Sequence, residues 1–214
     1  MAMHDELVPE PKRLEVFSNT DIKMAVVDAM DELMRETPID RLSVSKICDK
    51  ADISRATFYR YFTDKFSVVQ WLWKFVMAQG ANEIGRTLSF YDGYYASEVL
   101  ILERYYDFFA HAAKSNDYNS LDRFAPRLRK EVFERTITKH FKREYTEHMR
   151  FLVYVTAEME TRLFPMWHYG DIDCSIEEIC QWMTECVPCE LFNLLNDPIN
   201  PVRDPRSHIR RPMM

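Results

Sequence analysis

The sequence is poor in glycine, with 4 glycines in 214 residues, where an average protein has about 7%. Tight hairpin turns between strands depend on glycine, so its scarcity disfavours a hairpin-rich β protein. Helical periodicity runs through the middle of the chain, and we find neither a convincing alternating strand nor an internal repeat. The sequence therefore predicts an all-α fold.

The chain also has no apolar run near the roughly 18 to 20 residues that cross a bilayer. Its first 20 residues are too charged and too interrupted by proline for a signal peptide. The five cysteines have no regular spacing, so we expect reduced thiols rather than a disulfide framework. These features together predict a cytoplasmic protein.

Catalytic motifs are missing as well. We find no glycine-rich phosphate loop, no nucleophile elbow and no spaced set of carboxylates and histidines. We therefore expect no enzyme, no cofactor and no metal site.

The pair Cys186 and Cys189 is the one feature that suggests a thiol-dependent or metal-dependent sensor, which we keep as a remote alternative. The pair lies inside a predicted helix, and no second ligand pair at zinc spacing follows it. Pro188 more simply predicts a kink in that helix. The nearest further candidate ligands are His168, Cys174 and Cys180.

Positive charge is concentrated in one segment. The whole chain has a net charge of −6, whereas residues 41–65 carry six basic side chains against three acidic ones. A small cationic segment on an anionic body can dock on phosphate at one face while the rest repels it. An ordinary fluctuation of surface charge is an equally open explanation.

Three short helices are expected around this segment. Apolar residues at spacings of three and four predict a helix over 20–36, and Pro38 ends that pattern. Two further helices are predicted over 43–51 and 54–62, each beginning with a serine that can cap it. Two short helices joined by a tight turn have the dimensions of a helix-turn-helix, whose second helix lies in the DNA major groove.

The second of these helices would face outward with the chemistry that DNA recognition requires. Arg55 can bind guanine or phosphate, Ala56 and the Thr57 methyl can contact thymine, and tyrosine hydroxyls can reach phosphate oxygens. The alternative is an ordinary bundle in which Tyr59 and Tyr61 are core aromatics and the arginines solvate the surface.

The run LSVSKICDKADISRATFYRYFTDKFSVV, residues 42–69, resembles the DNA-binding segment of the tetracycline-repressor (TetR) family. The match includes the capped helix over 43–51, the turn into Ser54, the Thr-Phe-Tyr-x-Tyr-Phe block and the lysine at 65. The resemblance implies an amino-terminal three-helix helix-turn-helix domain. A linking helix would join it to an all-helical regulatory and dimerisation domain.

The resemblance also implies which side chains meet DNA. Side chains at the start of the first motif helix would lie near phosphates, and those at the start of the second would face base edges. The aromatic block and the lysine would contact the sugar-phosphate backbone of the DNA. The implied set is Ser43, Ser45, Lys46, Ser54, Arg55, Ala56, Thr57, Tyr59, Arg60, Tyr61 and Lys65. The implied core residues are Ile53, Phe58 and Phe62.

One position departs from the family pattern. The turn residue before Ile53 is usually glycine, and here it is Asp52. Aspartate tolerates the left-handed conformation better than most residues, so the turn should survive. Its negative charge predicts DNA binding that is weaker or more salt-sensitive than glycine would give.

The rest of the chain is expected to be helical. A long helix is predicted from the break at Thr63 and Asp64 to about Leu88, with further helices over 95–114, 124–145, 147–167 and 175–196. The expected divisions are a flexible arm at 1–17, the helix-turn-helix domain at 18–66 with its motif at about 43–62, a ligand-binding and dimerisation domain at 67–197, and a flexible tail at 198–214.

The resemblance implies a homodimer formed by the last two predicted helices. That arrangement would set two recognition helices about 34 to 36 Å apart, one turn of a palindromic operator. Packing in the core of the monomer would account for the apolar residues of these helices nearly as well as a dimer interface would. These residues are Phe151, Val155, Met159, Leu163, Trp182, Met183, Leu191 and Leu194.

Aromatic and methionine side chains crowd the region at 67–197, which suits an apolar or planar ligand, although core packing explains most of them singly. No motif names the ligand-binding residues. We expect above all a repressor released from its operator by a small apolar or aromatic effector. The alternative is a DNA-binding protein of the same fold controlled by a protein partner.

The segment at 127–150 is rich in charge, with eight Lys or Arg residues and four Glu residues. It suggests a second nucleic-acid surface or, as we favour, a solvated helix face with charge pairs.

Overall fold

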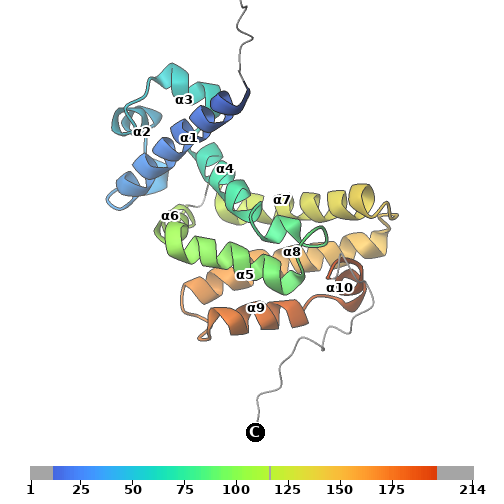
Figure 1. Ribbon diagram of the computed structural model, residues 1–214. Helices are drawn as coiled ribbons and strands as arrows, with labels where there is room; N and C mark the ends of the chain where they lie inside the picture. The colour runs from blue at the N-terminus through green and yellow to red at the C-terminus, as the bar shows by residue number, and fades with distance from the viewer. Residues whose placement is uncertain (1–11, 116, 197–214) are drawn as a thin grey trace, which may run out of the picture.

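The computed structural model describes residues 12–115 and 117–196, and side chains from residue 20 onward. Within those ranges the chain forms helices joined by turns, with one isolated bridge between Ile84 and Leu88, which confirms the predicted all-α class (Figure 1). In these ranges no helix is long and apolar enough to cross a membrane. The predicted tail at 198–214 and residues 1–11 of the predicted arm lie outside the described residues.

The amino-terminal helices pack as a small bundle. It comprises α1 (Lys12–Met34), α2 (Val44–Lys50) and α3 (Arg55–Tyr61), with a short 3-10 helix η1 (Ile39–Arg41) before α2. The first helix starts at Lys12 and not near residue 20, so residues 12–17, which lie within the predicted arm, are helical. No proline lies between residue 12 and the end of α1, so nothing in the sequence interrupts the helix there.

The linking helix α4 (Lys65–Met77) is shorter than the predicted helix to about Leu88. A capping box between Asp64 and Ser67 fixes its start. Beyond its end, Gly80 lies so close to α5 (Phe90–Leu100) that a Cβ atom there would be 2.5 Å from the carbonyl oxygen of Gly93. Only glycine fits there, and at Gly80 the backbone leaves the helical region, with φ −149° and ψ −91°, and turns into a short 3-10 helix, η2 (Ala81–Glu83).

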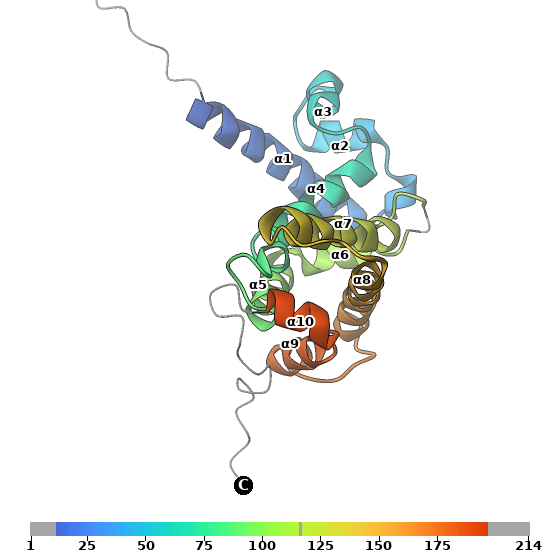
Figure 2. The same ribbon diagram turned by 90° about the vertical axis from the view of Figure 1, so that its right-hand side faces the viewer.

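The remaining helices form the body of the molecule. They are α6 (Tyr106–Ala112), α7 (Leu121–Arg135), α8 (Glu147–His168), α9 (Ile176–Glu185) and α10 (Cys189–Leu195), with π-helical turns η3 (Ile101–Tyr105) and η4 (Thr136–His140). In both views α2 and α3 lie at one end of the molecule and α9 and α10 at the other (Figures 1 and 2). The two motif helices are thus free of the body on their outer side.

Two predicted helices are each divided in the structure. The helix expected over 95–114 is interrupted by the π-helical turn η3. The helix expected over 175–196 ends at Glu185 and restarts at Cys189, because Pro188 has no amide hydrogen to continue it and instead precedes α10. The predicted kink is therefore a break between α9 and α10.

Candidate nucleic-acid interface and cavity

Both helices of the motif begin at serine caps, as predicted. The Ser43 hydroxyl accepts a hydrogen bond from the Lys46 amide at 3.3 Å, and the Ser54 hydroxyl accepts one from the Thr57 amide at 3.0 Å. Each bond satisfies one of the amide groups that a helix start leaves without an intrahelical partner. The caps fix where α2 and α3 begin and therefore which residues each helix exposes.

The turn between the two helices adopts the strained conformation expected at Asp52. Its φ angle is +51°, in the left-handed region, and the Ile53 amide donates to the Cys48 carbonyl oxygen at 3.0 Å to close the turn. Aspartate is among the residues that tolerate this conformation best. The glycine usual in the resembling family is therefore not required for this turn.

The two faces of α3 divide as the sequence predicts. Phe58 and Phe62 are buried, with their ring centroids 5.6 Å apart. Arg55 and Arg60 are exposed, and Tyr59 is 50% exposed. The Arg55 guanidinium lies 6.0 Å from the centre of the Tyr59 ring. The outer face of α3 is therefore cationic and aromatic, and it rests on a phenylalanine core.

The other residues of the expected DNA-binding set divide by exposure. Ser43, Lys46, Ser54 and Ala56 are exposed, and Ser45 and Thr57 are partly buried. They lie at the starts of the two motif helices, which the sequence also predicts.

Tyr61 and Lys65 face the protein more than the other predicted DNA-contacting residues do. Tyr61 is partly buried, and the Lys23 ammonium lies 5.8 Å from the centre of its ring. The Lys65 ammonium donates to the backbone oxygens of Asp40 at 2.8 Å and Leu42 at 3.0 Å. Lys65 thus ties α4 to the segment before α2, and its contact with phosphate stays a prediction.

Asp40 joins the helix-turn-helix to the body of the molecule. Its carboxylate accepts a hydrogen bond from the Ser115 hydroxyl, which follows α6, while its backbone oxygen accepts one from Lys65. Asp40 belongs to η1, which leads directly to the cap of α2. A movement of α6 could therefore shift η1 and the start of α2 through this hydrogen bond. Nothing in the sequence indicates the contact.

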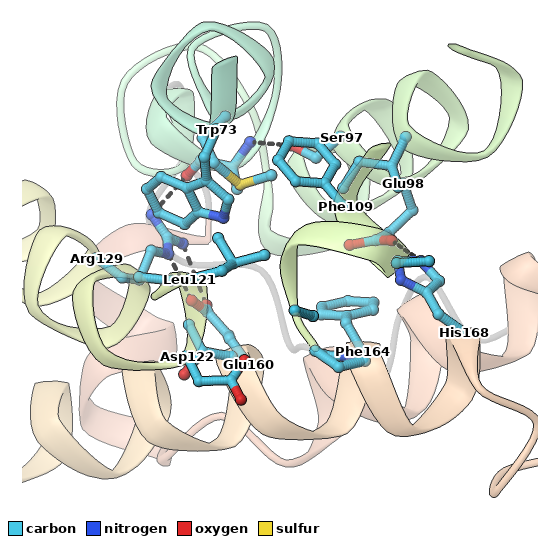
Figure 3. A pocket seen from close by; sticks show the side chains of 18 of the residues that line it. Trp73, Ser97, Glu98, Phe109, Leu121, Asp122, Arg129, Glu160, Phe164 and His168 are labelled. Atoms are coloured by element: carbon cyan, nitrogen blue, oxygen red, sulfur yellow. Dashed lines mark hydrogen bonds and ion pairs between the residues drawn. The ribbon is translucent and has the colours of Figure 1, made fainter. Parts of the chain in front are cut away.

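A cavity of about 100 Å³ lies among α4, α5, α6, α7 and α8 (Figure 3). Its wall is largely aromatic and aliphatic, with a few polar side chains. The wall includes Trp73, Met77, Tyr94, Ile101, Tyr106, Phe109, Leu121 and Phe164, together with Ser97, Glu98, Asp122, Arg129, Glu160 and His168. The sequence predicts the aromatic character of this region but not the polar groups.

A buried ion pair crosses the cavity wall between α7 and α8. The Arg129 Nε and Nη2 atoms donate to the two carboxylate oxygens of Glu160 at 2.5 and 3.1 Å, and Nη1 donates to the Ala81 oxygen at 2.7 Å. The Tyr94 hydroxyl also donates to Glu160, at 2.6 Å. Burial and the Glu160 charge raise the pKa of Tyr94, which keeps it a donor.

The burial of Arg129 corrects the prediction of a solvated face over 127–150, because this residue is only 2% exposed. Its neighbour Lys130 fits the prediction better and forms a partly exposed pair with Glu158 at 3.1 Å. A signal was present in the sequence: Arg129 lies four residues from both Ala125 and Phe133, on the apolar stripe of its helix.

A second buried polar pair faces the cavity from α5 and α8. The His168 Nε2 and a Glu98 carboxylate oxygen are 2.7 Å apart, and both side chains are largely buried. His168 is thus engaged by a carboxylate rather than grouped with cysteines. Within the described ranges, no three His, Cys, Asp or Glu side chains are grouped so that they could hold a metal ion.

Comparison with known proteins identifies the amino-terminal region. Residues 26–70 match the family described as bacterial regulatory proteins, tetR family. The match spans 45 of the 214 residues, all of them in the amino-terminal region. This match covers all of the motif described above, from the cap of α2 through the first turn of α4.

Two similar proteins carry the same regulator name. The HTH-type dhaKLM operon transcriptional activator DhaS of Lactococcus lactis subsp. lactis (strain IL1403) is 30% identical over 84 residues, which are 38% of this chain and 41% of that protein. The chain thus aligns with less than half the length of that relative. A solved structure, the dihydroxyacetone kinase operon activator DhaS, has 18% identity and a TM-score of 0.50, covering 82% of this chain and 98% of that one. That likeness extends the shared all-helical fold beyond the tetR-family domain.

Beyond the tetR-family domain, exposure separates the residues predicted for a dimer seam. Phe151 and Trp182 are 62% and 45% exposed, and Val155 is exposed beside Phe151 on α8. Met183 and Leu191 are buried in the monomer, so they belong to its own core. The apolar side chains available to a partner are thus a subset of those that the sequence suggests.

Proposed function

We propose that this chain is a sequence-specific DNA-binding transcription regulator that reads a palindromic operator as a homodimer. The outer face of α3 carries the proposal: Arg55 and Tyr59 are exposed on a helix whose opposite side is fixed by Phe58. An exposed arginine can bind guanine or phosphate, and a tyrosine hydroxyl can bind phosphate. The tetR-family match at residues 26–70 supports the same assignment.

The homodimer is supported by exposed apolar side chains on α8 and α9. Phe151, Tyr154 and Val155 are exposed on neighbouring turns of α8, and Trp182 is exposed on α9. Large exposed apolar side chains gathered on one element mark interaction surfaces more often than scattered ones do. We therefore assign the seam to these helices. Sedimentation of a Phe151→Glu variant should show monomers, whereas dimers at unchanged affinity would contradict this assignment.

The domain at 67–197 is proposed to sense a ligand and pass the signal to the domain at 18–66. The cavity supplies the site, and the Asp40–Ser115 hydrogen bond supplies a path from α6 to the start of the motif. A ligand that prefers one arrangement of the two domains shifts their equilibrium and therefore the affinity for DNA. Release of a repressor by a small apolar or aromatic effector remains the regulatory scheme that we favour from the sequence.

Fluorescence anisotropy of the purified protein on DNA from around its own gene, against a scrambled duplex at several salt concentrations, tests this function. We expect preference for one palindromic fragment and binding that weakens steeply with salt, because phosphate contacts release counterions. No preference at any salt, together with failure of selection from genomic DNA, would contradict the proposal.

A reporter gene behind the selected operator tests the sign of regulation. We expect expression to fall when the protein is present and to recover with effector. A rise in expression would instead match the similar protein from Lactococcus lactis, which is named an activator. A protein that regulates the reporter but is indifferent to small molecules would favour control by a protein partner.

A further inference from the structure

The size of the cavity limits what it can hold. Its volume of about 100 Å³ is smaller than the cavity of about 150 Å³ that takes up benzene in a protein core. Sites for drug-sized ligands measure about 300 to 1,000 Å³. The occupant of this cavity is therefore no larger than benzene.

The charges in the wall disfavour an anion. Arg129 is the only lysine or arginine among the residues that line the cavity, and Glu160 already engages two of its three nitrogen atoms. Glu98 and Asp122 add two further negative charges, and His168 is the one remaining side chain in the wall that can carry a positive charge. Even with His168 protonated, negative charge exceeds positive charge, so the wall favours a cation.

The aromatic rings add a second attraction for positive charge. Trp73, Phe109 and Phe164 surround the space that separates Glu98 on one side from Asp122 on the other (Figure 3). The faces of aromatic rings are electron-rich and attract cations, most strongly where water is excluded. An apolar cation would use the rings and the carboxylates together.

The π-helical turn η3 orients Glu98 and Phe109 toward the same cavity. It lies directly between α5, which carries Glu98, and α6, which carries Phe109. A π-helical turn holds one more residue than an α-helical turn and so rotates the following helix relative to the preceding one. Ile101, the first residue of η3, also lines the cavity. Such turns are frequent at functional sites.

We propose that the cavity binds a small organic cation, an alkylammonium no larger than benzene, with its carbon skeleton among the aromatic rings and its charge toward Glu98, while Asp122 across the cavity adds a longer-range attraction. Partial desolvation raises the pKa of the Asp122 carboxyl and outweighs the opposite effect of Arg162, so a bound cation would restore a stabilising charge there. Binding itself is independent of the function proposed above. The role of the cation as an effector rests on that function.

Three probes of similar size, none larger than benzene, test the binding in the full-length protein: cyclobutylammonium, cyclobutanol and cyclopropanecarboxylate. Calorimetry and thermal unfolding should show saturable binding of the ammonium and a matching rise in Tm. We expect the neutral alcohol to bind at least about tenfold more weakly, and the carboxylate more weakly still. An alcohol or a carboxylate that binds as tightly as the ammonium overturns the proposal.

Charge-neutral variants test the two carboxylates. Glu98→Gln should weaken ammonium binding about tenfold, with Glu103→Gln in η3 as an exposed control that leaves it unchanged. Asp122→Asn, at the exposed mouth, should weaken it less and is paired with Asp107→Asn on the exposed side of α6. Because Asp122→Asn alters an exposed residue, it keeps the test decisive if Glu98→Gln misfolds. Unchanged affinity in the folded variants overturns the proposal.

Operator binding measured in the same samples separates this inference from the proposed function. Ammonium binding without specific operator binding supports the cavity proposal and overturns the regulator. Specific operator binding without ammonium binding does the reverse. Operator affinity that changes upon addition of the ammonium, but not upon addition of the alcohol, supports both.

Discussion

The motif and the cavity use the same types of charged residue in opposite ways. On α3, Arg55 and Arg60 are exposed, and their positions are set by caps and by the buried phenylalanines beneath them. In the cavity wall, Arg129 is buried and is held in place by Glu160. An exposed arginine contributes little to folding and is available to a partner, whereas a buried one is committed to its ion pair. The location of an arginine therefore separates recognition from architecture.

The largest expected effect comes from breaking the buried pair. Arg129→Ala leaves Glu160 buried without its cation and should lower the free energy of unfolding by about 3 to 5 kcal/mol. Urea denaturation measures the loss, and Arg127→Ala on the exposed side of α7 is the control. Arg129→Met combined with Glu160→Met should recover part of the stability, because neither charge is then left unpaired but the Tyr94 hydroxyl and the Ala81 oxygen lose their hydrogen bonds.

Removing an exposed arginine should have the opposite signature. Arg55→Ala should weaken operator binding by about 1 to 3 kcal/mol while leaving thermal unfolding unchanged, because its side chain is exposed. Anisotropy measures the binding, and Arg135→Ala, an exposed arginine of α7, is the matched control. Unchanged operator affinity in a folded dimer with alanine at Arg55, Thr57 and Tyr59 would sink the assignment of this face.

The contact between the two regions offers a smaller test. Ser115→Ala removes the hydroxyl that donates to Asp40 and should cost about 1 kcal/mol of stability. We expect operator binding and ligand binding each to persist while ligand changes operator affinity less. Ser120→Ala, in the same connection but without a cap hydrogen bond, is the control. Equal coupling in both variants would place the signal path elsewhere.

The smallest expected effect concerns the reactivity of the cysteine thiols, which also differs between exposed and buried positions. Cys186 and Cys189 are exposed and should react fast with a disulfide reagent at neutral pH. Burial and the nearby Glu98 raise the pKa of the Cys180 thiol, so little thiolate is present and Cys180 should react only on unfolding. A change of operator affinity on oxidation that is absent from a Cys186→Ser and Cys189→Ser variant would revive the sensor alternative.

Local features of the motif could be predicted from the sequence because their determinants lie within a few residues of one another. The Ser54 cap spans three residues, and Phe58 and Phe62 lie four apart on one helix face. The left-handed turn at Asp52 depends on a single residue. Neighbouring residues fix such features before any tertiary contact forms.

Two of the errors in the sequence predictions have tertiary causes. Helix α4 ends before Gly80, where α5 passes too closely for any side chain. The break between α9 and α10 has a local cause instead: Pro188 cannot continue a helix, and the apolar pattern over 175–196 continues through it. Arg129 looks like part of a solvated charge pattern until α8 brings Glu160 against it.

The all-helical class, the helix-turn-helix and the outward chemistry of α3 follow from the sequence alone, since caps and periodicity act over three or four residues. The cavity depends on the folded arrangement of the helices, because its polar wall is assembled from residues far apart in the chain. Arg129 and Glu160 are separated by 31 residues, Tyr94 and Glu160 by 66, and Glu98 and His168 by 70. A buried charge is stable only beside its partner, and packing between helices, which no local pattern encodes, brings those partners together.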